Sequence, residues 1–276
     1  MGIAWSVFTK PWPRQPLVRL AYHVRLLGFD AIELPVRPGF QVEPADAGSA
    51  LPEAVRLLAS LGVRVASVAA EPDVATIEAC GAAGVPLLRT MARIAPEERY
   101  TAAEARLQQE YGALTTCLKD SGVKLGIQNH VGSFVPNALG LRALLEELDP
   151  DCFVAVWDAA HEALAGSKPE YALDVVAPRL GLVNLKNGYW SRRPSEQGGG
   201  WETIWCDARS GLADWAAVCR AMQRIGYQGD VCLTAEYSER EGVDRRIAAD
   251  LQLAREVFSG YDDFGNGGPA HNDKAN

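Results

Sequence analysis

Polar and ionisable residues stand at the ends of the apolar, strand-like runs of this sequence. In chain order they are Glu33, Glu71, Arg89, Gln128, Asn129, His130, Asp158, His161, Asn184, Lys186, Asn187 and Glu236. Carboxylate and amide oxygens are donors that hard divalent ions prefer. Such an ion can stabilise an enediolate, and a nearby carboxylate can move a proton beside a carbonyl group. The residue types therefore indicate carbohydrate chemistry, provided that the fold brings these strand ends together.

The elements that must position these residues follow one repeated sequence pattern. A helix-like stretch ends, a glycine follows, and a Val-, Ile- or Leu-rich run begins, as at Gly28, Gly62, Gly84, Gly122 and Gly226. Glycine suits the left-handed position that ends a helix. Runs without strict alternation are typical of strands buried on both faces. With three further runs, eight strands are predicted, at 3–8, 30–34, 64–69, 86–90, 124–129, 153–158, 180–186 and 230–236.

Helical segments fill the intervals between these strands. Apolar residues at helical spacing mark two of them, around residues 17–27 and 247–258. The others are expected at 51–61, 74–83, 102–118, 139–148, 171–176 and 215–225. Alternating strands and helices predict an α/β fold, a parallel (β/α)₈ TIM barrel in which catalytic groups gather at the carboxyl ends of the strands. The alternative is a doubly wound open sheet, which usually carries a Gly-rich phosphate turn after an early strand; none is present.

The barrel accounts for residues 1–260 as one domain, and we expect the polar residues 261–276 to form a disordered tail. A long insertion, residues 188–210, follows the seventh strand and contains Trp190, Trp201 and Trp205. It is either an ordered surface loop or a mobile lid with aromatic walls. We include Trp190 among the candidate substrate-binding residues because its flat face suits the C–H surface of a sugar.

Charge and cysteine usage limit the compartment and the partners. The 276 residues include 27 Lys and Arg against 35 Asp and Glu, a net charge of −8. This balance opposes binding to nucleic acid or to an anionic membrane. There is no apolar stretch long enough to span a membrane, and no signal peptide is recognised. Six scattered cysteines fit free thiols of a cytoplasmic protein, and a homo-oligomer is compatible with the sequence.

Four motifs, in this order, resemble the xylose isomerase-like TIM barrel superfamily, in particular its sugar phosphate isomerase/epimerase group. Residues 28–34 resemble the second strand of the family, Gly-Phe-Asp-x-aliphatic-Glu-aliphatic. Residues 158–161, followed by Gly166, resemble its Asp-x-x-His…Gly sixth strand. Residues 183–187 lie where the family has Val-His-Leu-Lys-Asp, and residues 211–215 resemble the entry to its seventh helix. The resemblance covers about residues 1–260 and implies an isomerase, epimerase or lyase.

The resemblance also implies a metal site. The family places Glu, Asp, His and Glu on strands five to eight, and the matching positions here are Gln128, Asp158, Asn184 and Glu236. Two of the four differ, so four oxygen donors remain with only two charges. Such a set would hold Mn²⁺, Mg²⁺ or Ca²⁺ weakly and would disfavour Zn²⁺. His161 matches a substrate-contacting histidine of the family.

These departures leave several functions open. On the first hypothesis the chain is an enzyme that transfers a proton with Glu236 as the carboxylate and His130 or His161 acting on substrate oxygens. Glu33, Glu71, Arg89 and Lys186 would then contact or polarise the substrate. Because Gln128 cannot act as a base, a one-base isomerisation or an elimination is favoured over a two-base epimerisation. The alternatives are a non-catalytic sugar-binding barrel and a metal-free lyase.

Overall fold

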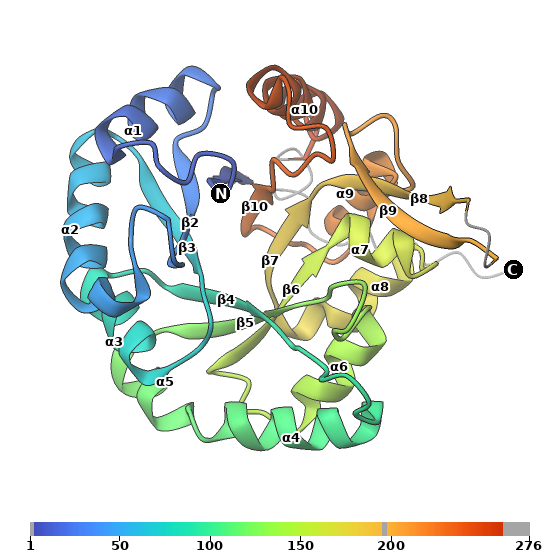
Figure 1. Cartoon of the computed structure of the whole chain (residues 1–276), viewed down its shortest axis with the longest axis horizontal. Helices are drawn as coiled ribbons and strands as arrows, with labels where there is room; N and C mark the ends of the chain where they lie inside the picture. The colour runs from blue at the N-terminus through green and yellow to red at the C-terminus, as the bar shows by residue number, and fades with distance from the viewer. Residues whose placement is uncertain (1–2, 195–197, 262–276) are drawn as a thin grey trace, which may run out of the picture.

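Eight parallel strands close into a barrel, as the sequence predicts, and helices surround it (Figure 1). The computed structural model describes residues 3–194 and 198–261. The strands follow one another around the barrel in the order β1-β10-β7-β6-β5-β4-β3-β2. They are β1 (Ala4–Phe8), β2 (Ala31–Pro35), β3 (Arg64–Ala69), β4 (Leu87–Met91), β5 (Lys124–Gln128), β6 (Phe153–Asp158), β7 (Leu180–Leu185) and β10 (Asp230–Leu233). The closed order excludes the doubly wound alternative.

The helices lie between the strands in sequence. They are α1 (Leu17–Leu26), α2 (Ala47–Ser60), α3 (Val74–Ala83), α4 (Tyr100–Gly112), α5 (Thr115–Ser121), α6 (Ala138–Glu146), α7 (Ala159–Leu164), α8 (Pro169–Val176), α9 (Trp215–Arg224) and α10 (Val243–Val257), with two 3₁₀ turns at Pro44–Asp46 and Ala177–Arg179. The single helix expected at 102–118 is two helices, α4 and α5. No helix among the residues 3–194 and 198–261 is long and apolar enough to cross a membrane.

The insertion after β7 forms an antiparallel hairpin of β8 (Asn187–Arg193) and β9 (Gly200–Cys206). The hairpin extends away from the barrel beside α7 (Figure 1). The three residues 195–197 at its tip lie outside the described residues, as do residues 262–276, which make up nearly all of the expected tail. The hairpin belongs to the same barrel face as the strand ends and brings aromatic side chains toward them.

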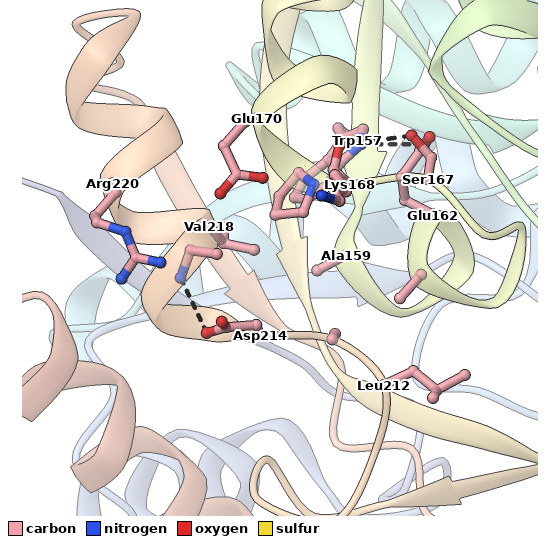
Figure 2. Close-up of a pocket in the computed structure, with 14 residues that line it drawn as sticks. Trp157, Ala159, Glu162, Ser167, Lys168, Glu170, Leu212, Asp214, Val218 and Arg220 are labelled. Carbon is pink, nitrogen blue, oxygen red and sulfur yellow. Dashed lines mark hydrogen bonds between the residues drawn. The ribbon is translucent and has the colours of Figure 1, made fainter.

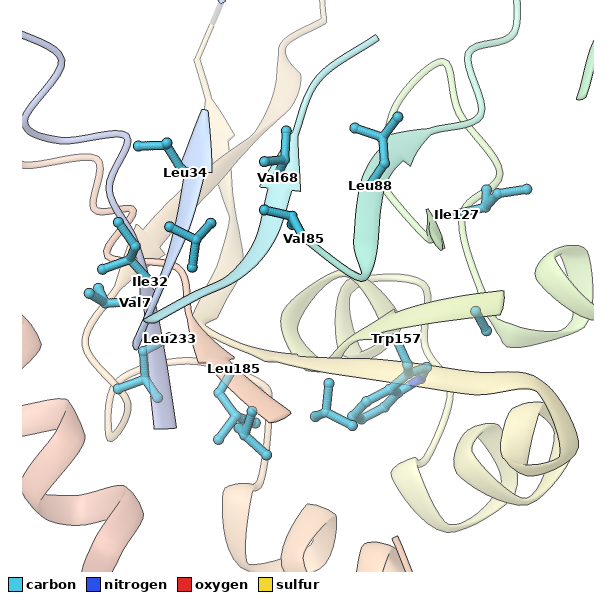
Figure 3. Close-up of a cluster of buried hydrophobic side chains, with 14 of the residues drawn as sticks. Val7, Ile32, Leu34, Val68, Val85, Leu88, Ile127, Trp157, Leu185 and Leu233 are labelled. Atoms are coloured by element: carbon cyan, nitrogen blue, oxygen red, sulfur yellow. The ribbon is translucent and has the colours of Figure 1, made fainter. Parts of the chain in front are cut away.

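Two apolar clusters lie on opposite sides of the barrel wall, because successive strand residues point to opposite faces. The larger cluster fills the space between strands and helices and includes Val7, Ile32, Leu88 and Ile127 (Figure 3). The second contains strand residues only and fills the barrel interior. It consists of Phe8, Ala69, Leu87, Val154, Val156, Leu182 and Cys232. Each later residue of the same parity on these strands therefore also faces the barrel axis.

Close packing of this interior gives a stability prediction. Gly126 lies on β5, and a Cβ atom there would be 2.6 Å from Val156 Cγ2 and 3.0 Å from Leu87 Cδ1. We expect Gly126→Ala to lower the free energy of unfolding by about 1–3 kcal/mol, the usual cost of overpacking. Gly48→Ala is the matched control, because the Cβ would meet nothing within 4 Å in α2. Urea denaturation should show the Gly126 variant alone to be destabilised, and equal midpoints would contradict the packing argument.

Candidate active site

The axis-facing residues at the carboxyl ends of the strands are the polar ones. Parity places them above the apolar interior cluster, at the barrel mouth. They are Glu33 on β2, Arg89 on β4, Gln128 on β5, Asp158 on β6, and Asn184 on β7, followed by Lys186 after β7 and Glu236 after β10. The sequence interpretation that these strand ends converge is therefore supported by the barrel geometry, and most of the group is buried.

A buried ion pair forms one side of this mouth. Arg89 Nε donates to Glu33 Oε1 at 2.9 Å and Nη2 donates to Oε2 at 2.5 Å. Both side chains are almost fully buried, and Ser67 Oγ also donates to Glu33 at 3.0 Å. The Arg89 guanidinium lies 4.8 Å from the centre of the Phe8 ring. Burial opposes the charge of Arg89, but Glu33 more than compensates and raises its pKa. The pair is a fixed, neutral unit.

Gln128 links this ion pair to Asp158. Arg89 Nη1 donates to Gln128 Oε1 at 2.8 Å, and Gln128 Nε2 donates to Asp158 Oδ2 at 3.0 Å. The amide thus presents its acceptor to the cation and its donor to the carboxylate. A glutamate here would face the Asp158 carboxylate directly with a like charge, which is unfavourable. Glutamine fits the geometry, and it offers no base.

Asp158 caps a helix as well as facing the mouth. Its Oδ1 accepts backbone N–H groups of Ala160 at 3.0 Å and His161 at 3.1 Å at the start of α7. Burial raises the pKa of Asp158 to about 6, although Lys186 and the two backbone donors act in the opposite direction. Asn129 fixes the same strand end, since its Oδ1 accepts the Asp158 backbone N–H at 2.7 Å.

Glu236 is held between two lysines. Lys186 Nζ donates to Glu236 Oε2 at 2.9 Å, and Lys10 pairs with the other oxygen. Burial raises the pKa of Glu236, but the two ammonium groups outweigh it and hold the value below the ordinary range. The preceding residue, Ala235, has φ of 51°, a left-handed conformation that costs energy in a residue other than glycine. The backbone is thus strained where it presents this carboxylate.

Lys186 lies at the centre of the mouth. Its Nζ is 2.9 Å from Glu236 Oε2, 4.0 Å from Asp158 Oδ2 and 4.0 Å from the centre of the Trp205 ring. Its side chain is 4% exposed, so the charge is compensated by these neighbours rather than by bulk water. Trp205 belongs to β9, and the hairpin therefore contributes an aromatic wall.

The two candidate histidines stack on each other, with ring centroids 3.8 Å apart. His161 Nδ1 accepts the backbone N–H of Val131 at 3.2 Å, which leaves the proton on Nε2. His161 Nε2 is buried and has no partner among the described residues. His130 Nδ1 lies 2.7 Å from Val131 O and must therefore carry its own proton. With respect to the residues described, the pair therefore offers a donor, His161 Nε2, and an acceptor, His130 Nε2, that are not engaged by the protein.

Neutral histidines are expected from this arrangement. Burial, then Lys186, lowers the pKa of His130 to about 4 and that of His161 well below its ordinary value. We expect ¹⁵N NMR to show the Nδ1–H form for His130 and the Nε2–H form for His161, with neither ring titrating between about pH 6 and 8. Below the unfolded value of about 6.5, the unfolded chain binds more protons, so their contribution to stability declines as the pH falls toward 4. An imidazolium signal at neutral pH would contradict the assignment.

The Asn184 carboxamide is the least satisfied group of the mouth. It is fully buried, and neither Oδ1 nor Nδ2 has a hydrogen-bond partner among the described residues. Asn184 lies beside Asp158 in the β6–β7 register. Buried polar groups without partners are rare and require an explanation such as a ligand or water. The Asn184 amide is therefore a candidate for binding a ligand.

Two sequence-predicted residues stand apart from this network. Glu71 follows β3 and is exposed. Trp190 lies on β8, is 40% exposed, and donates from Nε1 to Leu164 O at 3.1 Å. Trp190 and Trp201 together line an apolar pocket on the hairpin. Glu71 and Trp190 remain predicted substrate contacts. Within the described residues, neither forms a hydrogen bond or ion pair with the group at the barrel mouth.

Several residues of the site do not stand out from the sequence. Lys10 lies two residues after the end of β1, and extending the strand-end rule to β1 would have identified it. Trp205 is marked only as part of the insertion. Glu162 accepts hydrogen bonds from Asn129, Trp157 and the Ala138 backbone. It thereby connects β6, α6 and the residue that follows β5, next to the barrel mouth. A buried glutamate in a short helix carries no sequence signal of this role.

A separate cavity of about 320 Å³ lies outside the barrel, between the α7–α8 connection and α9 (Figure 2). Trp157, Glu162 and Ser167 lie at one end of it, and Asp214 and Arg220 come from the α9 side (Figure 2). Glu162 already accepts three hydrogen bonds, and Asp214 caps α9 through the Ala217 N–H. The cavity contains no strand-end group of the mouth, and we place the candidate active site at the mouth instead.

The implied divalent metal does not fit the donor set of the mouth. Gln128 Oε1 accepts from Arg89, both Asp158 oxygens accept hydrogen bonds, and both Glu236 oxygens pair with lysines. Among the residues that the structure describes, Asn184 is the one implied ligand whose oxygen has no hydrogen-bond or ion-pair partner. Within residues 3–194 and 198–261, no three His, Cys, Asp or Glu side chains form a metal-holding group. A hard cation requires several free oxygen ligands, and this set supplies one.

Enzymes with a (β/α)₈ barrel carry their catalytic side chains at the carboxyl ends of the strands, and the ionisable groups of this chain lie at the same place. Comparison with known proteins specifies the family. The xylose isomerase-like TIM barrel family model matches residues 22–257. The chain belongs to this family, as its motifs indicate. No curated protein matches the chain by sequence.

Solved structures resemble the chain in fold at low identity. D-psicose 3-epimerase from Clostridium cellulolyticum, solved with D-tagatose, has a TM-score of 0.73 and 14% identity, covering 92% of this chain and 99% of that one. IOLI protein, solved with a bound zinc atom, has a TM-score of 0.75 and 14% identity. The alignment covers 94% of this chain and 99% of that one. The probable 3-DHS dehydratase AsbF of Bacillus anthracis has a TM-score of 0.66 and 13% identity. The alignment covers 91% of this chain and 98% of that one. Structural similarity at such low sequence identity establishes a shared fold and no more. The reaction therefore has to be inferred from the residues of the site.

Proposed function

We propose that this chain is a sugar isomerase, epimerase or lyase that moves a proton at a carbon next to a carbonyl group. The observation that carries the proposal is the Glu236–Lys186 pair at the barrel mouth, a carboxylate and an ammonium group 2.9 Å apart. A base beside a fixed positive charge is what proton abstraction next to a carbonyl requires, since negative charge develops on the carbonyl oxygen. The epimerases and the dehydratase among its structural relatives support the same general class.

Glu236 is the carboxylate that we assign as the base. Its side chain is 21% exposed, whereas the side chains of Glu33 and Asp158 have no exposed surface. It is therefore the one of the three that can meet a substrate carbon. Lys10, which is 46% exposed, can swing away from Glu236 when a substrate enters. Its departure also removes one of the charges that weaken Glu236 as a base.

The remaining groups bind oxygen atoms of the substrate. In our proposal the Lys186 ammonium stabilises the enolate oxygen, and His161 Nε2 and the Asn184 amide bind hydroxyl or carbonyl oxygens. His130 Nε2 accepts a hydrogen bond from a hydroxyl group. Glu33 and Arg89 satisfy each other, so we give them a supporting role rather than a substrate contact.

The single base restricts the reaction. Gln128 holds both Arg89 and Asp158 and cannot accept a proton, so no second carboxylate faces Glu236 from that side. We therefore favour same-face transfer between aldose and ketose, or elimination of a β-hydroxyl group, over a two-base epimerisation. A substrate with adjacent carbonyl and hydroxyl groups meets the requirements of both reactions.

Exchange of hydrogen in deuterium oxide tests the proposal even while the product is unidentified. The purified protein would be incubated with a panel of aldo-, keto- and 3-keto-sugars, and ¹H NMR would follow loss of the signal next to the carbonyl. Enzyme-dependent exchange would support the function, and the product would separate isomerase, epimerase and lyase. Absence of exchange with every member of the panel would count against it.

A non-catalytic sugar-binding barrel is the second candidate. The observation that favours it is the engagement of Glu236 by two lysines, which weakens it as a base. Calorimetric binding of a sugar without exchange, unchanged in Glu236→Gln, would favour this candidate. The six free cysteines fit a reducing compartment, and we propose the cytoplasm as the location for either function.

A further inference from the structure

We infer that the ammonium group of Lys186 takes the place of a divalent cation at this barrel mouth, so that the chain works without a metal. The catalytic consequence rests on the proposed function, whereas the absence of a working metal site does not. The inference depends on three independent features: the position of Nζ, the charge balance of the mouth and the free polar groups around it.

The position of Lys186 Nζ is the position of a bridging cation. It lies 2.9 Å from one oxygen of Glu236 and 4.0 Å from Oδ2 of Asp158, between the two carboxylates that match ligand positions of the family. The Trp205 ring faces it at 4.0 Å, and an aromatic face stabilises a cation. The ammonium group is thus held from three sides by β6, β9 and the end of β10.

The charges that form ion pairs in the mouth already balance. Glu33, Asp158 and Glu236 contribute three negative charges, and three cations neutralise them. These cations are Arg89, Lys186 and Lys10. A divalent ion would leave the cluster with two excess positive charges in a buried setting, which proteins avoid. Lys186 stands where the family pattern also has Lys, so the difference in this chain is the pair of amides at positions 128 and 184, in place of a carboxylate and an imidazole. Without that charge and that nitrogen ligand, the ammonium group is the cation that remains between Asp158 and Glu236.

The free groups around Lys186 form a place for a substrate oxygen. Asn184 and Lys186 are two residues apart on β7 and its extension, so both face the barrel axis. The Asn184 amide has no partner within the described part of the chain, and His161 also contacts Trp205, with ring centroids 5.0 Å apart. An oxyanion could therefore meet an ammonium group and neutral donors without an intervening metal.

Direct metal binding tests the inference without any activity assay. Manganese(II) would be added to chelator-treated protein, and bound and free ion would be separated by electron paramagnetic resonance. We expect no stoichiometric binding by the wild type. In Lys186→Met with Gln128→Glu and Asn184→His, which removes the cation and restores the two missing ligands, we expect affinity to rise by at least about 10- to 100-fold.

Two controls keep the result decisive. Lys124→Met, at an exposed position at the start of β5, removes the same charge and should leave the manganese signal unchanged. Circular dichroism would confirm that each variant is folded, and the wild type gives an answer even if the triple variant is not. Stoichiometric binding by the wild type that is lost in Asp158→Ala would overturn the inference. Failure of sugar exchange would remove the proposed function and leave the metal result standing.

Discussion

Arg89→Met should lower the free energy of unfolding by about 3–5 kcal/mol, which is the cost expected when one partner of a buried ion pair is removed. The substitution leaves the Glu33 carboxylate fully buried, and Ser67 is then its one remaining side-chain donor within the described part of the chain. It also removes the hydrogen bond to Gln128 Oε1. Chemical denaturation followed by circular dichroism would measure the loss.

Two comparisons separate this effect from general disturbance of the barrel. Glu33→Gln combined with Arg89→Met removes the uncompensated charge, and the double variant should be more stable than Arg89→Met alone. Arg64→Met breaks an ion pair with Asp230 that is partly exposed, and should cost at most about 1 kcal/mol. Equal losses for Arg89 and Arg64, or additive losses in the double variant, would show that the buried pair has no special weight.

Glu236→Gln should lower the rate of hydrogen exchange next to the carbonyl by about 10²–10⁴-fold, the usual contribution of a general base. The amide is nearly isosteric, so it can still accept from Lys186 or Lys10 through Oε1, but it cannot take a proton. Because the substitution retains the shape of the site, sugar affinity should change much less than turnover. Exchange in deuterium oxide and calorimetry on the same preparations measure both quantities.

Glu241→Gln is the matched control for this variant. It makes the same chemical change five residues later, at an exposed position after β10, and exchange should continue at the wild-type rate. If Glu236→Gln retains full activity, the base must be another group. If Glu241→Gln also loses activity, loss of negative charge on this face of the protein, rather than loss of a base, is the cause.

The barrel itself could be predicted because its signals are local and repeated. Glycines at helix ends and strands buried on both faces recur along the chain, and the observed strand bounds lie within three residues of those predicted. The helix expected at 102–118 shows the limit of such signals. Thr115 Oγ1 bonds to Gly112 O at 2.7 Å, and this competition with the helical backbone accompanies the break between α4 and α5.

The hairpin β8–β9 could not be predicted by the same pattern. It is a two-stranded ribbon with much of both faces exposed, so neither alternation nor a continuous apolar run marks it. Aromatic and β-branched residues in 201–205 are a signal for a strand, but the neighbouring glycines and arginines obscure it.

The members of the mouth were predictable from strand ends, but their partners were not. A strand-end position predicts that Gln128 faces the axis, and it does not show that both ends of its amide are occupied by Arg89 and Asp158. The sequence suggests Lys186 only as an electrostatic helper, since it gives no distance between the ammonium group and the carboxylates. Assigning metal ligands by their positions in the family motifs therefore identifies the region of the site. It does not reveal that the Lys186 ammonium group lies between the two carboxylates.

Trp205 provides the mouth with an optical reporter. Its indole ring lies 4.0 Å from the Lys186 ammonium group and edge-to-face with His161, at 5.0 Å between centroids. A nearby charge shifts the emission of an indole, so a molecule that draws Lys186 away from the ring changes the fluorescence of this residue. Occupancy of the site can therefore be read by intrinsic fluorescence, with Trp205→Phe as the reference, before any substrate has been identified.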